Sequence, residues 1–419
     1  GPGERCVDGR VVYVGHTRER RLVLNKSVES VTWLGSDNDL QPRSRESLDV
    51  QTHASLERNA GSINDFANSI RAMRRHEIER IGLGWMSGVI DDKASLAGMT
   101  DVYDAAIDAS LTWAIRHQTQ EMGLDEAPAA IAVIGMGRYG GREVNFSSDA
   151  DVIIIYRPSD NADDNQANLF ARKVQEDLRA ILQGPTTLEP KIELDMDLRP
   201  EGKNGPLVRS YASCEEYYRS WASTWEHQAL LRARYAAGDA ALAEDFLMNV
   251  ADPLRYPKID LTEAQVAEIR KLKARMEAER LPRGVRRDRH LKLGKGGLSD
   301  VEWTIQLLQL QHAGDNANLR VNGTMQALDE LERRKLVSAG DAVVLRRAWW
   351  MCTAARNGSY LWSGRVNQAD ILPDDTYSLG GLAVYLGYDA NRGQHFENDL
   401  LAVMRKARDV TERLFYGLS

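Results

Sequence analysis

Two aspartates separated by one residue, Asp149 and Asp151, follow a glycine-rich stretch and precede the β-branched run Val152–Tyr156. Alternate residues of a strand point to the same face, so both carboxylates are expected to project together from its edge. Adjacent carboxylates repel one another unless a cation lies between them, and hard oxygen ligands suit Mg²⁺ that carries phosphate. Glycines let backbone N–H groups approach a polyphosphate closely. The segment therefore predicts metal-assisted nucleotidyl transfer.

A third carboxylate is expected on a second strand. Residues 191–198 alternate apolar and acidic side chains, which predicts a strand with Glu193, Asp195 and Asp197 on its wet face. Such transfer often uses two metals about 4 Å apart, and a third carboxylate can also take the proton from an incoming hydroxyl. An isolated Asp-x-Asp is usually only a polar strand start. The glycine turn, the buried strand and the second acidic strand together favour a metal site of Asp149, Asp151 and Asp195.

The four glycines between positions 135 and 141 have two interpretations. A dinucleotide-binding fingerprint needs another spacing and a long helix that opens at once, and the sequence predicts neither. We therefore interpret the segment as a phosphate turn. Its candidate phosphate contacts are Arg138, Gly140, Gly141, Ser147 and Ser148.

A second cluster spans Lys292–Trp303, where glycines precede a helix whose first turn carries Asp300 and Glu302. Acidic residues at that end are ordinary helix caps. Two lysines on a glycine loop, Lys292 and Lys295, can equally reach a phosphate group. We favour the phosphate-binding interpretation over the helix cap, with Lys292 as the candidate phosphate contact.

Two further patterns carry less information. Aromatic, acidic and basic residues lie at helical spacing from Trp221 to Arg234, and in this patch Arg232 and Arg234 are candidates for binding a nucleotide or a partner. A lone histidine such as His227 is more often structural than catalytic. The segment Leu34–Asp39 repeats the letters Gly-Ser-Asp-x-Asp, but no buried strand follows it, so we interpret it as a polar turn.

Composition limits the class of protein. The net charge of −7 over 419 residues disfavours a nucleic-acid binder, since phosphate contacts need a basic surface. The cysteines Cys6, Cys214 and Cys352 form no disulfide or metal pattern, which predicts a cytoplasmic protein. We expect no membrane segment, because no apolar run is long enough to span a bilayer. The start Gly1-Pro-Gly, without methionine, suggests a fragment of a longer protein.

The chain is expected to fold in three parts, as a mainly helical α+β protein. Residues 1–125 would hold a possible hairpin at 10–14 and 21–24, followed by helices from Ser62 and over about 101–123. Residues 126–250 would hold strands at 129–134, 152–156 and 191–198, with a helix at 164–183 that stops at Gly184. Residues 251–419 would form an antiparallel helical bundle, with helices at 263–280, 299–313, 324–335, 339–358 and 397–415.

These clusters, in this order, resemble the glutamine synthetase adenylyltransferase family over roughly residues 60–419. The matching segments are Gly135–Glu143, Ser148–Asp151, Asp195–Pro200, Trp225–Ala229 and Gly296–Glu302. The resemblance implies a nucleotidyltransferase domain of the DNA polymerase beta type, followed by the bundle. It places Asp149 and Asp151 on the metal pair and Asp195 on the third acidic position. It also implies Mg²⁺ or Mn²⁺, ATP as substrate, glutamine synthetase as protein substrate and a PII-type nitrogen signal protein as regulator.

Enzymes of this family have two homologous halves, one that adds AMP to a tyrosine of glutamine synthetase and one that removes it by phosphorolysis to ADP. Thr224–Leu230 and Gly296–Glu302 resemble the adenylylating half, whereas Val144–Asp149 resembles the removing half. The family's first arginine in Asp-Leu-Arg-Leu-Arg-Pro is replaced here by Asp197, which leaves Arg199 alone to contact phosphate. On balance the resemblance implies the adenylylating half, with release of pyrophosphate.

The removing half is the enzymatic alternative. A non-catalytic regulatory scaffold is a second alternative, but it predicts an incomplete acidic triad, whereas all three carboxylates are present. A template-directed or transfer-RNA nucleotidyltransferase would share the sheet chemistry, and the acidic net charge disfavours it.

Overall fold

The computed structural model describes residues 4–7, 10–13, 40–185, 191–281 and 284–418. A short antiparallel hairpin, β1 (Glu4–Val7) and β2 (Arg10–Tyr13), lies at the start of the chain. The predicted strand at 10–14 is therefore present, but it pairs with the preceding residues. Its expected partner at 21–24 and the polar turn at 34–39 lie outside the described residues.

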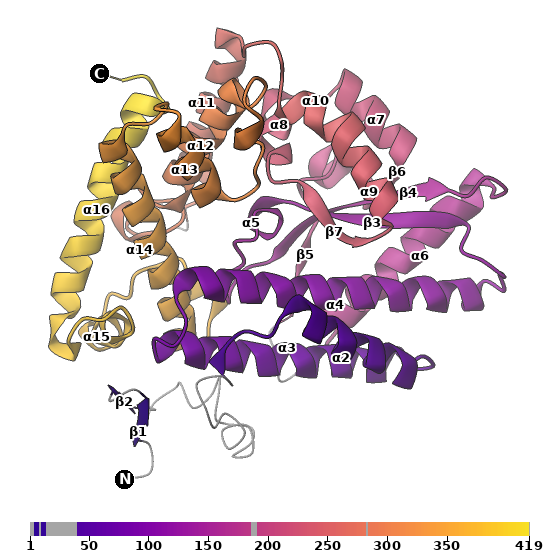
Figure 1. Cartoon of the computed structure of the whole chain (residues 1–419), viewed down its shortest axis with the longest axis horizontal. Helices are drawn as coiled ribbons and strands as arrows, with labels where there is room; N and C mark the ends of the chain where they lie inside the picture. The colour runs from indigo at the N-terminus through magenta and orange to yellow at the C-terminus, as the bar shows by residue number, and fades with distance from the viewer. Residues whose placement is uncertain (1–3, 8–9, 14–39, 186–190, 282–283, 419) are drawn as a thin grey trace.

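A five-stranded mixed sheet forms the centre of the first two thirds of the chain (Figure 1). Its long strands, β3 (Ala129–Gly135) and β4 (Ala150–Pro158), are antiparallel and confirm the two predicted buried strands. Strand β7 (Arg234–Gly238) extends the sheet beyond β3. On the other side, β4 pairs in parallel with two short strands, β5 (Leu194–Asp195) and β6 (Val208–Ser210).

The third predicted strand, 191–198, is wrong in extent, because only Leu194–Asp195 pairs with β4. The Asp195 Oδ1 atom accepts a hydrogen bond from the backbone N–H of Asp197 at 2.8 Å, which turns the chain away from the sheet. Alternation of apolar and acidic residues therefore marked the face of Asp195 correctly, and a local side-chain hydrogen bond ended the strand early.

Helices cover both faces of the sheet. Side chains such as Ile131 and Val133 pack against α3 (Ile63–Met86), α4 (Asp92–Glu121) and α6 (Asp164–Gln183). Alternate side chains such as Ala132 and Ile134 face the other core. That core contains α7 (Tyr211–Ser220), α9 (Ala240–Asp245) and the π-helix η4 (Phe246–Ala251). Both faces of β3 and β4 are thus buried, as their continuous apolar runs predict.

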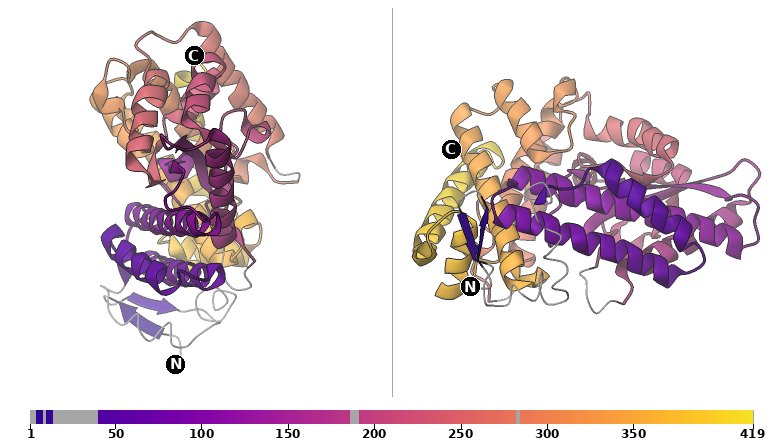
Figure 2. Two further views of the ribbon diagram at one scale, coloured as in Figure 1. Left: turned by 90° about the vertical axis from the view of Figure 1, so that its right-hand side faces the viewer. Right: turned by 60° about the horizontal axis from the view of Figure 1, so that its bottom comes forward.

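The N-terminal helices run alongside the sheet in Figures 1 and 2. The first of them, α2 (Arg45–Arg58), packs against α4. Helix α3 begins next to Ser62, where a helix was predicted to start, and the Ser62 side chain caps it by accepting from the N–H of Asp65 at 3.3 Å. Helix α4 begins earlier than the predicted residue 101, because the Asp91 carboxylate caps it by accepting from Ala94 N–H at 2.7 Å. Helices α3 and α4 share one core with the sheet, and the division at residues 125/126 and 250/251 stays a prediction.

The C-terminal part of the described chain is helical, as predicted, and has a core of its own. Its principal helices are α11 (Glu263–Glu279), α12 (Leu298–His312), α13 (Thr324–Arg333), α14 (Ala339–Ser363), α15 (Thr376–Tyr385) and α16 (Gly393–Leu414). Two short helices join the sheet region to this bundle, α8 (Thr224–Leu230) and α10 (Asp252–Arg255). The fold is thus mainly helical with a small mixed sheet. In the described part of the chain, no helix combines the length and apolarity needed to cross a bilayer.

A buried charge cluster joins three helices of the bundle. The Asp300 carboxylate, 1% exposed, pairs with Lys273 of α11 and with Arg408 of α16, the latter at 3.2 Å. It also accepts from the backbone N–H of Gly296 at 2.6 Å. These two cations lower the pKa of Asp300 against the effect of burial. Asp300 thus has a structural role in the first turn of α12. It does not take part in the phosphate binding considered for the cluster Lys292–Trp303.

Removing this charge is expected to destabilise the bundle, because Lys273 and Arg408 lose a buried partner. We predict that Asp300→Asn lowers the free energy of unfolding by about 3 kcal/mol. Chemical denaturation compares it with the matched change Asp260→Asn at an exposed position, which should cost less than about 0.5 kcal/mol. Equal stability of the two variants would contradict this assignment.

Candidate functional site

Asp151 and Asp195 are neighbours because their strands pair in register. Asp151 of β4 lies opposite Asp195 of β5, and exposed Asp149 immediately precedes β4. The Asp151 carbonyl accepts from the N–H of Met136 at 2.8 Å, which draws the turn after β3 over the strand. The next residue, Gly137, has φ +51°, and a Cβ there would lie 2.1 Å from Asp151 Oδ2. Only glycine fits at this point beside the carboxylate.

The three carboxylates interact electrostatically. Burial, and then the charges of Asp149 and Asp195, raise the pKa of Asp151 to about 7, while Lys292 and Arg138 act in the opposite direction. The pKa of Asp195 is also raised, first by burial and then, after a compensating hydrogen bond from Asp197, by neighbouring carboxylates. Negative charge is therefore concentrated where the sequence predicted it.

This donor set fits a divalent cation. In the described residues, no three His, Cys, Asp or Glu side chains are arranged to hold a metal by protein ligands alone. Mg²⁺ usually takes only one or two carboxylates and completes its shell with water and substrate phosphates. Two hard carboxylates that repel each other, with the small cradle at Gly137 beside them, match that mode of binding.

Two cavities meet at Asp149. The larger, about 900 Å³, lies between the sheet region and the bundle, and its lining includes Arg138, Asp149, Asp151, Trp225, Lys292 and Glu302. The smaller, about 330 Å³, opens on the side of β5 and is lined by Asp195, Arg179 and Lys203 as well as Asp149. The larger volume is ample for a nucleotide-sized ligand. Asp149 thus lines both cavities, Asp151 lines the larger one and Asp195 lines the smaller one.

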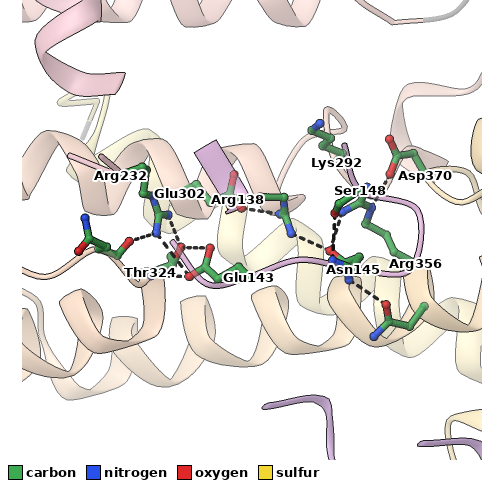
Figure 3. Close-up of polar contacts among 12 residues, drawn as sticks. Arg138, Glu143, Asn145, Ser148, Arg232, Lys292, Glu302, Thr324, Arg356 and Asp370 are labelled. Carbon is green, nitrogen blue, oxygen red and sulfur yellow. Dashed lines mark hydrogen bonds and ion pairs between the residues drawn. The ribbon is translucent and has the colours of Figure 1, made fainter. Parts of the chain in front are cut away.

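The segment from Gly137 to Asp149 is clamped to the bundle at two points. In the first (Figure 3), the Glu143 carboxylate accepts from Thr324 N–H at 2.5 Å and from Thr324 Oγ1 at 2.9 Å. Arg232 contacts both Thr324 and Glu143. Arg232 also lines the larger cavity, so this predicted candidate borders the site while its guanidinium is engaged in the clamp.

The second clamp centres on Asn145, which is 1% exposed. Its Oδ1 accepts from Arg138 at 3.1 Å and from Arg356 of α14 at 3.0 Å, and its Nδ2 donates to Asn357 Oδ1 at 2.8 Å. Figure 3 shows Arg138 between Asn145 and the Glu302 carboxylate, with which it also pairs. Arg138 therefore lines the larger cavity from a position fixed by the bundle, and its contact with phosphate stays a prediction.

Three other predicted phosphate contacts do not line the larger cavity. Gly140 and Gly141 are buried outside the cavity lining, because both pack closely on Arg232: added Cβ atoms would lie 2.1 Å and 2.7 Å from its atoms. The guanidinium of Arg199 donates to three backbone carbonyls, those of Gly205, Met196 and Lys203. Gly140 and Gly141 thus line neither cavity, whereas Arg199 lines the smaller cavity beside Asp195 with its guanidinium held by backbone carbonyls.

Ser147 and Ser148 remain close to the carboxylates in the chain. Ser148 Oγ accepts from Asn145 N–H at 2.9 Å, so this hydroxyl shapes the turn. Ser147 Oγ is buried and has no hydrogen-bond partner within the described part of the chain. Ser147 is thus the better placed of the two to accept or donate a further hydrogen bond.

Of the remaining predicted residues Lys292, His227 and Arg234, only Lys292 lines the larger cavity. Lys292 lines the larger cavity and lowers the pKa of Asp151, whereas Glu226 is used in a capping box at the start of α8. Burial lowers the pKa of His227. The largely buried Arg234 side chain pairs with Asp104 at 2.8 Å and does not line the cavity.

Sequence reasoning missed several cavity residues. Asp370 lines the cavity and pairs with Arg356. His290 also lines it, and its Nδ1 accepts from the N–H of Leu293 at 3.1 Å while burial lowers its pKa. These residues lie among helices and loops without a recognisable spacing. No signal in one sequence singles them out.

The raised pKa of Asp151 predicts a pH-dependent effect on stability. Between its unfolded value near 4 and its folded value of about 7, the folded protein holds a proton that the unfolded chain releases, so stability is lost as pH rises through this window. Asp151→Asn removes that loss. We expect the variant to unfold at a higher temperature than the parent near pH 8, and at a similar temperature near pH 4.

Calorimetry in the presence of a chelator measures both unfolding temperatures without bound metal. The chelator matters because a bound cation would remove the repulsion. An Asp151→Asn variant that is less stable than the parent near pH 8 would contradict the electrostatic description of the site.

Comparisons with known protein families match the chain in two parts. The family model described as "Glutamate-ammonia ligase adenylyltransferase" matches residues 23–249, and that described as "GlnD PII-uridylyltransferase" matches residues 267–415. The first match contains the three carboxylates and both long strands. The second covers most of the bundle.

Curated relatives match nearly the whole chain. A "Bifunctional glutamine synthetase adenylyltransferase/adenylyl-removing enzyme" of Bifidobacterium longum strain DJO10A is 79% identical over 394 residues, 94% of this chain and 37% of the relative. Proteins of the same name from Leifsonia xyli and Mycobacterium tuberculosis are 42% and 44% identical, over 94% and 82% of this chain and 38% and 34% of theirs. The chain thus spans little more than a third of the length of these relatives.

Proposed function

Because the chain belongs to the glutamate-ammonia ligase adenylyltransferase family, we propose that it transfers AMP from ATP to a tyrosine hydroxyl of glutamine synthetase. The observation that carries this proposal is the set of three mutually repelling carboxylates at one end of β4, beside a cavity of about 900 Å³. The names of the relatives supply the protein substrate. The reaction forms a bond between the tyrosine oxygen and the α-phosphorus, breaks the bond to the β-phosphate oxygen, and releases pyrophosphate.

The residues of the larger cavity hold the nucleotide. Lys292 and Arg138 are the two cations that act on Asp151, so they are also positioned to balance the charge of a triphosphate bound there. Glu302 and Asn145 fix the direction of the Arg138 guanidinium. Such preorganised charge contributes more inside an enclosed cavity than in water.

Asp149 and Asp151 would hold Mg²⁺ or Mn²⁺, with Asp195 sharing it or acting as base. When bound, the cation neutralises phosphate charge and polarises the α-phosphate. The tyrosine would arrive from the smaller cavity, on the β5 side, where Asp195 takes the proton from its hydroxyl. The raised pKa of Asp195 suits this role, since it strengthens the carboxylate as a base.

We also propose that the sheet region is a nucleotidyltransferase domain of the DNA polymerase beta type. A mixed sheet with two carboxylates at the head of one strand and a third on its parallel neighbour is what a nucleotidyltransferase domain of the DNA polymerase beta type requires. The match of residues 267–415 to a PII-uridylyltransferase model supports a PII-type signal protein as regulator of the bundle. A cytoplasmic location would suit these partners.

The removing half of the family is the second candidate. The segment Val144–Asp149 resembles that half in sequence, whereas Trp225–Gln228 and Gly296–Glu302 resemble the adenylylating half. The two reactions use the same carboxylates. They are separated by whether the chain labels unmodified glutamine synthetase from ATP, or releases ADP from the modified enzyme in a phosphate-dependent reaction.

We predict that Asp149→Asn and Asp151→Asn each lower the rate of AMP transfer by at least about 10²–10³-fold, because each removes a charge that neutralises and positions the reacting groups. The assay follows radiolabel from ATP into glutamine synthetase. The matched change Asp164→Asn, at an exposed position in the first turn of α6, should leave the rate within about twofold. Normal labelling by either active-site variant would refute the assigned site.

A further inference from the structure

A third cavity, of about 420 Å³, lies where the N-terminal helices meet the bundle. It is bordered by the end of α3 and start of α4, by α14, and by the segment that joins α15 to α16. None of its lining residues lines either cavity at the carboxylates. The proposed function therefore gives it no role.

Aromatic rings line much of this space. They include Trp85 at the end of α3, Trp350 on α14, Tyr385 at the end of α15 and Tyr388 after it. The rings of Trp85 and Tyr385 meet edge to face, with centroids 6.3 Å apart. Aromatic faces carry partial negative charge and attract cations, most strongly in partly desolvated places.

A carboxylate without a cation lies among these rings. Asp92 accepts from Trp85 Nε1 at 2.8 Å and makes no ion pair within the described part of the chain. Burial raises its pKa to about 6. Its neighbour Asp91 is exposed and caps α4, so helix capping accounts for Asp91. The position of Asp92 in the first turn favours its charge, but does not explain why this carboxylate lines a cavity bordered by aromatic rings.

We propose that this cavity binds a small molecule carrying a protonated amine, with the ammonium group against Asp92 and the rings of Trp85, Trp350 and Tyr388. A charge-assisted hydrogen bond and cation–π contacts together supply recognition. The exposed cation Arg347, which also lines the cavity and has no ion pair in the described residues, would meet a carboxylate on the same ligand. A volume of about 420 Å³ suits a molecule of this size.

The cavity is connected to the carboxylate-bearing segment through α14. Asn357 lies near enough to Asp92 to lower the pKa of this carboxyl, although its Nδ2 makes no hydrogen bond within the described residues, and its Oδ1 accepts from Asn145 Nδ2 at 2.8 Å. Asn145 in turn holds Arg138 in the larger cavity. An ammonium ion against Asp92 acts on the first member of this chain of contacts, so its binding should alter the protection of residues 137–149.

Calorimetric titration of the full chain at pH 8 tests the proposal with three probes: n-butylammonium, norleucine and butyrate. We expect both amines to bind and butyrate not to bind. Asp92→Asn should weaken binding of n-butylammonium at least about tenfold, while the exposed control Asp260→Asn should not change it. Asp92→Asn keeps an oxygen acceptor for Trp85 Nε1, and an unchanged or raised unfolding temperature confirms that it folds.

Arg347→Gln distinguishes the two kinds of amine. If it weakens norleucine but not n-butylammonium, the ligand is a zwitterion; if neither changes, the ligand is a simple amine. Absence of heat from both amines, or equal binding by the parent and Asp92→Asn, would overturn the site. Unchanged hydrogen exchange over residues 137–149 in the amine-bound protein would overturn the link to the carboxylates.

Discussion

Repulsion among three carboxylates at the end of one buried strand is the constraint on which the site depends. Strand β4 can hold Asp149 and Asp151 there because β3, β5 and β6 pair with it and apolar layers cover both its faces. The cost of the arrangement appears in the raised pKa of Asp151. Two nearby cations, Lys292 and Arg138, offset it only in part, so the site favours a further positive charge.

The helical bundle completes this site, although the carboxylates belong to the sheet. Lys292, Glu302 and Asp370 enter the larger cavity from the bundle side. Glu143 and Asn145 clamp the segment between β3 and β4 to α13 and α14. Because both clamps end on side chains of the same short segment, a movement of the bundle would change the position of Arg138 relative to the carboxylates. This arrangement would give the regulator proposed above a physical route to the site.

Much of the fold could be predicted because its signals are local. The apolar runs of β3 and β4, the stop of α6 at Gly184 and the cap of α3 at Ser62 depend on neighbours in the sequence. The end of β5 depends instead on a hydrogen bond from Asp197 to the Asp195 side chain, which alternation does not reveal. The start of α4 is earlier than predicted, although the cap at Asp91 that sets it is also a local feature.

Side-chain identity was enough to expect the carboxylates, Arg138 and Lys292 close together, and the structure places them around one cavity, while their roles stay predictions. It did not predict that Gly140 and Gly141 serve close packing on Arg232, or that Arg199 holds backbone carbonyls. The first role is set by a tertiary contact, and the second by how residues 196–205 fold around the Arg199 guanidinium. The most direct test of the proposed chemistry is to incubate the chain with Mg²⁺, unmodified glutamine synthetase and ATP labelled on either the α- or the γ-phosphorus. Transfer of AMP predicts that α-label enters glutamine synthetase and that γ-label appears only in pyrophosphate; γ-label on the protein, or no α-label, would contradict it.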